Sequence, residues 1–203
     1  METVGYKVIV FDFDGTLVDT ASVKRDAFFE VLPKPCHAAV ESVLSANPDG
    51  SRHAVIPSML DEARTCGVDV SGLDAETVIA AYSDAVRQAV RQAPDVPGVH
   101  NVLGWAAGLA PVYVFSMTPA RELSSAISQR CWSGYVSQAF GYPAGKEDVL
   151  ASLIDRHCAQ PEDVLVVGDG KSDHDAAAAH GCGFYQISPN RPLDGIMNFG
   201  GAK

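Results

Sequence analysis

The chain has 203 residues, of which 47% are hydrophobic, and its 25 acidic and 15 basic side chains give a formal net charge of −10. The hydrophobic fraction is too high for a disordered chain, and the length suits one domain or a core with a smaller insertion. Because the net charge is negative, we expect neither nucleic acid nor an anionic membrane as a partner.

Five cysteines are scattered along the chain and form no CxxC pair. This pattern is typical of reduced thiols and argues against a disulfide framework or a zinc site. The first residues do not resemble a basic and apolar leader, and no uncharged apolar run approaches the roughly 20 residues of a membrane helix. We therefore expect a cytoplasmic protein.

The first predicted strand, at residues 8–11, is followed by two carboxylates of like charge. Its sequence VIVF is the apolar run of a buried strand, yet Asp12 and Asp14 follow at once and Gly15 closes the run as at a turn. A buried strand has no packing reason to end in two like charges. These carboxylates therefore require a chemical explanation.

Residues 19–95 contain several helical patterns and no strand pattern. Over residues 74–93 apolar side chains recur at helical spacing, and the sequence PDVPG at 94–98 ends the segment. The segment is too long for a simple crossover between two strands. We interpret it as an inserted helical cap, which predicts a cap at residues 19–95 and a discontinuous core at residues 1–18 and 96–203.

The rest of the chain alternates between predicted strands and helices. Strands are predicted at residues 111–116, 135–140, 163–168 and 183–187, and helices at 119–130, 146–158 and 172–180. The first of these helices has Thr118 as its N-cap and Pro119 at its first position. Such alternation favours right-handed crossovers and an α/β fold with a doubly wound, Rossmann-like parallel sheet. The glycine-rich tail at 190–203 is expected to be poorly ordered.

Three of the predicted strands end in polar residues. Asp12 follows the first strand, Ser116 ends the second, and Asp169 follows the fourth. In an open parallel sheet, ligands bind outside the carboxyl ends of the strands. Carboxylates gathered there repel each other unless a cation lies between them, and hard oxygen ligands suit Mg²⁺. We therefore predict a Mg²⁺ site at this edge of the sheet, with Asp12 as a ligand.

Lys146 and the residues after Ser116 predict a site for an anion. Lys146 lies in the expected first turn of a helix, where the helix dipole disfavours a cation. Beside the carboxylates, its charge can keep Asp12 ionised and neutralise an incoming anion. The Ser116 hydroxyl and the backbone amides of Met117 and Thr118, expected to face outward at a helix start, form a cradle for phosphate oxygens.

The chain resembles the haloacid dehalogenase (HAD) superfamily in four motifs, which are DFDGTLVD, the strand-terminal Ser116, Lys146 and GDGKSD. The resemblance covers about residues 5–20 and 96–190. The helical insertion after the first motif resembles the cap of phosphoglycolate-phosphatase-like and β-phosphoglucomutase-like members. The resemblance implies a Mg²⁺-dependent phosphatase that hydrolyses a small phosphorylated metabolite through an aspartyl-phosphate intermediate.

The resemblance implies separate roles for the two leading aspartates. Asp12 would be the nucleophile and a Mg²⁺ ligand. Asp14 would protonate the leaving oxygen and then activate water, while its backbone carbonyl contacts the metal. Such covalent catalysis divides a hard hydrolysis into two displacements, with Mg²⁺ and Lys146 offsetting the charge of the phosphoryl oxygens.

The later motifs would bind the phosphoryl group and the metal. The resemblance assigns Ser116 and Lys146 to the phosphoryl group, and the amide of Met117 is added from the expected helix start. Asp169 would be a metal ligand, and Asp173 either a ligand or a nearby anchor. An aspartate early in a helix also serves as an ordinary cap, so both interpretations of Asp173 stay open.

Other functions stay open at this point. A β-phosphoglucomutase-like phosphotransferase keeps both aspartates and is the first alternative, whereas dehalogenases lack an aspartate at the position of Asp14. A phosphoacceptor signalling module or a non-enzymatic binding protein is a weaker alternative. All four motifs are filled here, and receiver domains carry no long helical insertion after the first strand.

The cap is the expected source of selectivity, because the core motifs handle only the phosphoryl group. Lys24 and Arg52 are candidate contacts to the substrate, and solvated surface charges are the simpler alternative. Arg52 lies in the sequence DGSRHAV at an expected loop-to-helix junction, where a guanidinium can bind a second anionic group bidentately. The sequence indicates neither the substrate nor the oligomeric state.

Overall fold

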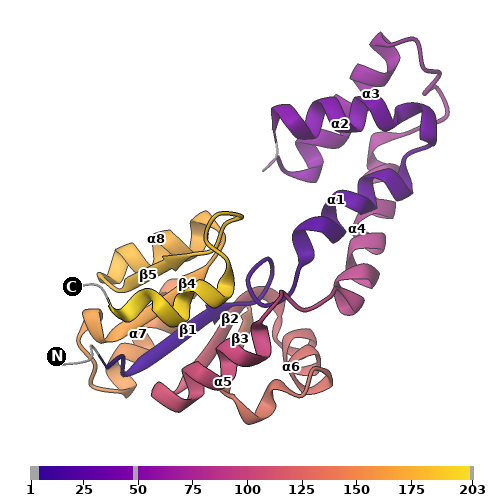
Figure 1. Ribbon diagram of the computed structural model, residues 1–203. Coiled ribbons are helices and arrows are strands. Elements are labelled where there is room, and N and C mark those ends of the chain that lie inside the picture. The colour runs from indigo at the N-terminus through magenta and orange to yellow at the C-terminus, as the bar shows by residue number, and fades with distance from the viewer. Residues whose placement is uncertain (1–4, 48–49, 202–203) are drawn as a thin grey trace. The chain divides into compact units, whose positions relative to one another are not determined.

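The structure is a computed structural model that describes residues 5–47 and 50–201 (Figure 1). The chain divides into two compact units, which we call the core unit (residues 1–19 and 94–203) and the helical unit (residues 20–93). The first part of the core unit thus ends at residue 19 where 18 was expected, and its second part begins at 94 where 96 was expected. The role of the helical unit as a cap stays a prediction.

The core unit is built on a five-stranded sheet in which all neighbouring strands run parallel. In spatial order the strands are β3 (Val136–Tyr142), β2 (Val112–Pro119), β1 (Val8–Asp12), β4 (Val164–Gly168) and β5 (Gly183–Gln186). Every residue of β1 is buried, as expected for the central strand of a parallel sheet covered on both faces. The predicted doubly wound α/β fold is confirmed.

Helices cover both faces of the sheet. They are α5 (Val99–Leu109), α6 (Ala120–Gln129), α7 (Lys146–Arg156) and α8 (Lys171–His180), with short 3₁₀ helices η2 (Trp132–Gly134) and η3 (Pro161–Asp163) after α6 and α7. Helices α7 and α8 share an apolar cluster with alternate strand residues, among them Val8 and Val10 of β1. The chain runs from β1 to β3 in one direction along the sheet and from β3 to β5 in the other. Right-handed crossovers therefore put α5 and α6 on the opposite face.

The strand order reverses at β1, which lies between β2 and β4. From β1 the chain proceeds to β2 and β3 on one side, and it then returns to β4 on the other side. Doubly wound sheets bind ligands at the carboxyl ends of the strands beside such a reversal. The end of β1, where Asp12 lies, is therefore the expected position of a ligand.

The end of β2 differs from the sequence-based expectation. The strand continues through Pro119, and α6 begins at Ala120 with Pro119 as its N-cap, so the prediction of Thr118 as the N-cap is wrong. The backbone here lies close to β3, because a Cβ atom on Gly141 would fall 2.5 Å from the carbonyl oxygen of Thr118. Pro119 pairs with Tyr142 of β3, so the segment stays in the sheet up to the start of α6.

The C-terminal tail is more ordered than its composition predicts. Residues Leu193–Gly201 form a 3₁₀ helix, η4, that packs against α5, and both Leu193 and Ile196 are completely buried. The Tyr185 hydroxyl on β5 donates a hydrogen bond to the carbonyl oxygen of Pro192 at 2.8 Å. Over the described residues, the expectation of a poorly ordered tail is therefore wrong.

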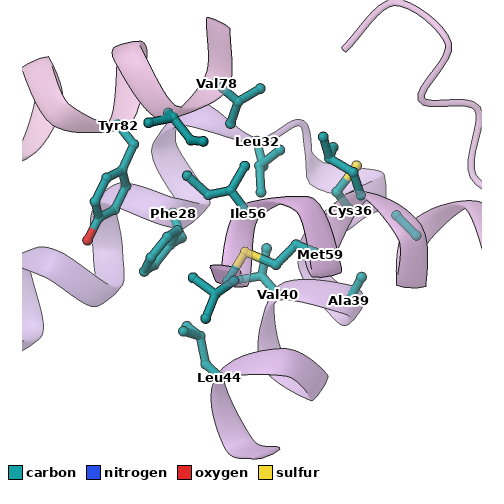
Figure 2. Close-up of a cluster of buried hydrophobic side chains, with 14 of the residues drawn as sticks. Phe28, Leu32, Cys36, Ala39, Val40, Leu44, Ile56, Met59, Val78 and Tyr82 are labelled. Atoms are coloured by element: carbon teal, nitrogen blue, oxygen red, sulfur yellow. The ribbon is translucent and has the colours of Figure 1, made fainter. Parts of the chain in front are cut away.

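The helical unit surrounds an apolar cluster (Figure 2). Its described helices are α1 (Thr20–Val31), η1 (Lys34–Cys36), α2 (His37–Ala46), α3 (Arg52–Thr65) and α4 (Ala75–Gln92). Phe28 of α1 and Tyr82 of α4 stack at the edge of the cluster, with ring centroids 4.2 Å apart. In the described part of the whole chain, no helix has the length and apolar character needed to span a membrane.

The two linkers between the units lie against each other. Val18 forms an antiparallel bridge with Asp95, and the N–H of Asp19 donates to the carbonyl oxygen of Pro94 at 2.9 Å. The Nε of Arg130 donates to Oδ1 of Asp95 at 2.8 Å. The chain therefore leaves and re-enters the core unit at one place, which Arg130 helps to fix.

Candidate active site

Six of the predicted site residues meet at the carboxyl edge of the sheet. They are Asp12 at the end of β1, Asp14 in the turn that follows, Ser116 in β2, Lys146 at the start of α7, Asp169 after β4 and Asp173 in the first turn of α8. The side chains form two hydrogen-bonded groups, one around Lys146 and one around Asp14. The two groups are neighbours because Asp12 belongs to the first, and Asp14 follows it two residues later in the chain. These side chains therefore lie at the carboxyl edge of the sheet, where the reversal of strand order at β1 predicts a ligand.

Lys146 lies between two buried carboxylates. Its Nζ donates to Oδ1 of Asp12 at 2.7 Å and to Oδ1 of Asp173 at 2.5 Å, and it lies 4.8 Å from the centre of the Phe115 ring. Burial by itself lowers the pKa of Lys146, but the charges and hydrogen bonds of the two carboxylates raise it by more, so the net pKa lies above the usual value. Lys146 is therefore a cation at neutral pH.

Asp12 is a buried carboxyl group in acidic surroundings. Burial raises its pKa most, the charge of Asp173 raises it further, and Lys146 offsets these effects only in part, so the pKa reaches about 8. A further cation beside Asp12 would favour its ionised form, which is the form that can act as a nucleophile.

Three carboxylates can hold such a cation. Asp12, Asp169 and Asp173 each offer one oxygen atom, and these oxygens lie within 4.8 Å of one another, so a single ion can contact all three. Asp12 and Asp173 are buried, whereas Asp169 is exposed. Carboxylate oxygens suit hard cations such as Mg²⁺, which usually keep several water ligands as well. These residues fit a hard divalent cation.

Glycines allow the aspartates to approach one another. A Cβ atom on Gly168 would lie 2.4 Å from the carboxyl carbon of Asp173, and one on Gly15, which has a left-handed φ of +82°, would lie 2.3 Å from Oδ2 of Asp169. Asp173 also accepts a hydrogen bond from the N–H of Gly170 at 3.0 Å, as a helix cap does. Asp173 is thus both a cap of α8 and a member of the carboxylate group, and its contact with a metal stays a prediction.

Asp14 is held by two hydroxyl groups that donate to the same oxygen. Oγ of Ser116 donates to Oδ2 of Asp14 at 2.9 Å, and Oγ1 of Thr118 donates to it at 2.7 Å. The Asp14 carboxylate is not a member of the three-carboxylate group. The predicted contact of its backbone carbonyl with a metal stays a prediction. A carboxyl group held apart from the cation site suits proton transfer.

Sequence analysis missed the hydroxyl contacts of two threonines. Thr118 was expected as a helix N-cap and as a backbone amide of the phosphate cradle, with no role for its hydroxyl. Thr16 was given no role, but it is completely buried and its Oγ1 donates to Oδ1 of Asp169 at 3.1 Å. The signal for Thr118 is its spacing from Ser116, because residues two apart in a strand share one face of the sheet. That signal appears only when β2 is extended through Pro119.

The structure contradicts one contact of the predicted phosphate cradle and leaves the others as predictions. The N–H of Thr118 donates to Oγ of Ser116 at 2.9 Å and lies in a strand, so the prediction that it faces outward at a helix start is wrong. The side chain of Met117 is exposed, and its amide as a phosphate contact stays a prediction. Met117 and Lys146 also line an open pocket of about 390 Å³, whose described lining includes the acidic Glu147, Asp148 and Asp175 but none of the site's aspartates.

Lys24 and Arg52, the two candidate specificity residues, belong to the helical unit. Lys24 lies in α1, Arg52 is the first residue of α3, and both are exposed. Burial raises the pKa of the Tyr82 hydroxyl, and the nearby charge of Arg52 lowers it in part. The same hydroxyl donates to the carbonyl oxygen of Lys24 at 3.2 Å. Arg52 and the backbone of Lys24 therefore share the surroundings of Tyr82, and their role in selectivity stays a prediction.

Comparisons with known proteins agree with the motifs. The family model for haloacid dehalogenase-like hydrolases matches residues 6–181, which confirms the resemblance. The chain is 26% identical over 204 residues to phosphoglycolate phosphatase of Pseudomonas putida, covering 93% of this chain and 73% of that protein. It is 28% identical over 198 residues to tyrosine-protein kinase PtkA of Mycobacterium tuberculosis, covering 86% of this chain but only 60% of the kinase. A solved structure of a putative β-phosphoglucomutase from Thermotoga maritima matches with a TM-score of 0.66 at 16% identity, covering 96% of this chain and 91% of that one.

Proposed function

The chain belongs to the haloacid dehalogenase-like hydrolases, and we propose that it is a Mg²⁺-dependent phosphatase that hydrolyses a small phosphorylated metabolite. One observation carries the proposal: three carboxylates whose oxygens lie within 4.8 Å of one another meet beside Lys146, next to a separate carboxyl group held by hydroxyls. Such a site suits phosphoryl transfer, in which negative charge spreads over the phosphoryl oxygens. The likeness to a phosphoglycolate phosphatase supports a phosphate ester as the substrate class.

Asp12 is the nucleophile of the first step. One of its carboxylate oxygens attacks phosphorus, the bond between phosphorus and the leaving oxygen breaks, and Asp14 gives a proton to the leaving oxygen. Lys146 stabilises the negative charge of Asp12 and of the phosphoryl oxygens. Asp12, Asp169 and Asp173 are the residues that would hold Mg²⁺. The bound ion supplies the further positive charge that keeps Asp12 ionised.

The second step releases phosphate and restores the enzyme. Water attacks the phosphorus of the aspartyl-phosphate, the bond from phosphorus to Asp12 breaks, and inorganic phosphate leaves. Asp14 lost its proton in the first step, so it can take the proton of the attacking water. One carboxyl group therefore serves as acid and then as base.

A β-phosphoglucomutase-like phosphotransferase is the alternative function. It uses the same two aspartates but passes the phosphoryl group to a sugar hydroxyl instead of to water. The likeness to the putative β-phosphoglucomutase supports only the shared fold at 16% identity. The activity named for the mycobacterial kinase is not proposed, because the chain spans 60% of that protein. Release of inorganic phosphate distinguishes the phosphatase from the phosphotransferase.

The helical unit is the proposed cap, and Lys24 and Arg52 are its proposed contacts to the substrate. A helical cap on two paired linkers can close over the site and exclude water from it.

All five cysteines are free thiols, which supports a reducing compartment such as the cytoplasm.

Phosphate release from a panel of phosphorylated metabolites, with and without Mg²⁺, tests the proposal. Exhaustive chelation is expected to abolish turnover, and added Mg²⁺ is expected to restore it. Ca²⁺ should not restore it, because its larger and looser coordination shell changes the geometry of the site. Full activity after dialysis against EDTA would falsify the metal dependence.

A pair of variants ties this metal dependence to the carboxylate group. Asp169→Asn should need more Mg²⁺ to reach half of its maximal rate. Asp155→Asn changes an exposed aspartate of α7 outside the group and should behave as the wild type does. If the two variants respond to Mg²⁺ alike, Asp169 is not a metal ligand.

A further inference from the structure

The hydroxyl groups around Asp14 assign a role to a residue that the four motifs do not name. We propose that Thr118 is the positioning residue of Asp14: its hydroxyl keeps the carboxyl group aimed for proton transfer while the Ser116 hydroxyl turns to the phosphoryl group. The inference rests on the proposed function, because it takes Asp14 as the general acid and base.

The first observation is that both hydroxyls converge on one oxygen atom. Oδ2 of Asp14 accepts from Ser116 at 2.9 Å and from Thr118 at 2.7 Å. In the described part of the chain, no residue donates a hydrogen bond to Oδ1 of Asp14. The two oxygens of this carboxyl group therefore have different surroundings, and only Oδ1 is free to meet a substrate.

This asymmetry locates the proton that Asp14 transfers. A hydroxyl group has one hydrogen to donate, and Oδ2 already receives two of them. While both hydroxyls donate to Oδ2, a proton on Asp14 is placed on the other oxygen, Oδ1. Oδ1 is then the atom that gives the proton to the leaving oxygen, and later takes one from the attacking water.

The Ser116 hydroxyl has a single hydrogen and two possible acceptors for it. Its oxygen accepts from the N–H of Thr118 at 2.9 Å, and its hydrogen goes to Asp14. If Ser116 also binds the phosphoryl group, its hydrogen must leave Asp14 when the substrate arrives. Thr118 is then the remaining donor that holds Oδ2, at the moment when the acid is needed.

The backbone holds Thr118 firmly enough for this purpose. Thr118 lies in β2, two residues after Ser116 and on the same face of the strand. The β2–β3 pairing is irregular here: Phe115 pairs with Phe140 and the next paired position is Pro119 with Tyr142, so Thr118 lies in the stretch between two paired positions. Gly141 lets the two backbones approach closely at this stretch, and the pairing on both sides of Thr118 limits the movement of its backbone.

The chemistry predicts which esters depend on Thr118. In the first step an Asp12 oxygen bonds to phosphorus, the bond to the leaving oxygen breaks, and the proton on Oδ1 of Asp14 moves to that oxygen. An alkoxide needs this proton to leave, whereas p-nitrophenolate leaves without it. Loss of the Thr118 hydroxyl should therefore slow alkyl esters selectively.

The experiment compares ethyl phosphate with p-nitrophenyl phosphate as substrates of two variants. Thr118→Val removes the hydroxyl and keeps the shape, and Thr118→Ser keeps the hydroxyl. The ratio kcat/KM is measured, because it reports events up to the first displacement. We expect Thr118→Val to lower kcat/KM about tenfold or more for ethyl phosphate and less than about threefold for p-nitrophenyl phosphate. Thr118→Ser should restore the ethyl phosphate value to within about threefold of the wild type.

The matched control is Thr77→Val in the helical unit. Thr77 also donates its hydroxyl to an aspartate, Asp74, at 2.8 Å, so the control loses the same kind of hydrogen bond. It should leave both substrates unchanged. If Thr118→Val does not fold, Thr118→Ala is compared with Thr118→Ser in its place.

The possible outcomes distinguish a failure of the role proposed for Thr118 from a failure of the proposed function. Equal losses for both esters, no loss for either, or a failure of Thr118→Ser to restore activity would overturn the role of Thr118 and leave the phosphatase proposal intact. A wild-type protein that hydrolyses no phosphate ester at all would overturn both.

Discussion

The core unit and the helical unit bury different kinds of side chain. Among the described residues, the core unit buries four polar or charged ones, Asp12, Thr16, Ser116 and Asp173, whereas the helical unit buries one, Thr20. The remaining buried residues of the helical unit are apolar, as the cluster in Figure 2 shows. Burying charges close to one another opposes folding, so their presence in the core unit points to chemistry.

This difference predicts that substitutions in the core unit and in the helical unit affect activity and stability differently. The raised pKa of Asp12 shows that its ionised form is held in unfavourable surroundings. Changes at the site should therefore remove activity with little loss of stability. Changes in the apolar cluster of the helical unit should reduce stability and leave the chemistry of the phosphoryl group intact.

The largest expected effect is that of Asp12→Asn on turnover. The variant keeps the shape of the side chain but lacks the nucleophile, so the rate of phosphate release should fall on the order of 10⁶-fold. Its melting temperature, measured in EDTA, should stay close to that of the wild type, because the amide oxygen of the asparagine can still accept the hydrogen bond from Lys146. A strong loss of stability would show that Asp12 serves the fold, and the contrast between the units would break.

The second effect concerns Met59, which is completely buried in the helical unit. Met59→Ala leaves a cavity and should lower the free energy of unfolding by about 2–5 kcal/mol, measured by denaturant titration. Well below the melting temperature, kcat/KM for p-nitrophenyl phosphate should change little. Ser58→Ala, at an exposed neighbour on α3, is the control and should change neither quantity. A loss of activity without a loss of stability would contradict the comparison.

The site could be predicted from the sequence because its residues follow strands of continuous apolar character. Asp12 and Asp169 each come directly after such a run, and the parallel sheet brings the ends of β1 and β4 to one edge. Asp173 was less clear, because its spacing fits both a cap and a ligand. The structure combines the cap with the carboxylate group, since Gly168 and Gly170 leave space for the side chain.

The features that sequence analysis missed depend on contacts between distant segments. Thr118 before Pro119 has the pattern of an N-cap, but Pro119 pairs with Tyr142 of β3, so the strand continues past Thr118. The tail is rich in glycine, but its helix η4, which carries the buried Leu193 and Ile196, packs against α5, far away in the sequence. The secondary-structure propensity of a short segment carries no information about such contacts with distant segments.

The smallest expected effect is that of Arg52→Ala on selectivity. If Arg52 binds a second anionic group of the substrate, its removal should lower kcat/KM for the preferred metabolite about tenfold or more, from roughly 1.5–3 kcal/mol for a charged hydrogen bond. Hydrolysis of p-nitrophenyl phosphate should hardly change. Arg64→Ala is the control, because Arg64 is an exposed arginine of the same helix already paired with Asp61. Equal losses for both substrates would make Arg52 a structural residue.

Trapping the covalent intermediate tests most directly whether Asp12 attacks phosphorus. The protein is mixed with p-nitrophenyl phosphate and Mg²⁺, quenched in acid within milliseconds, and reduced with borohydride, which converts a phosphorylated aspartate to homoserine. Mass spectrometry of the peptides then locates the modified residue. We predict modification at Asp12 alone and none in Asp12→Asn. Modification at Asp14 or Asp169, phosphate found on Ser116, or unmodified protein during rapid turnover would contradict the mechanism.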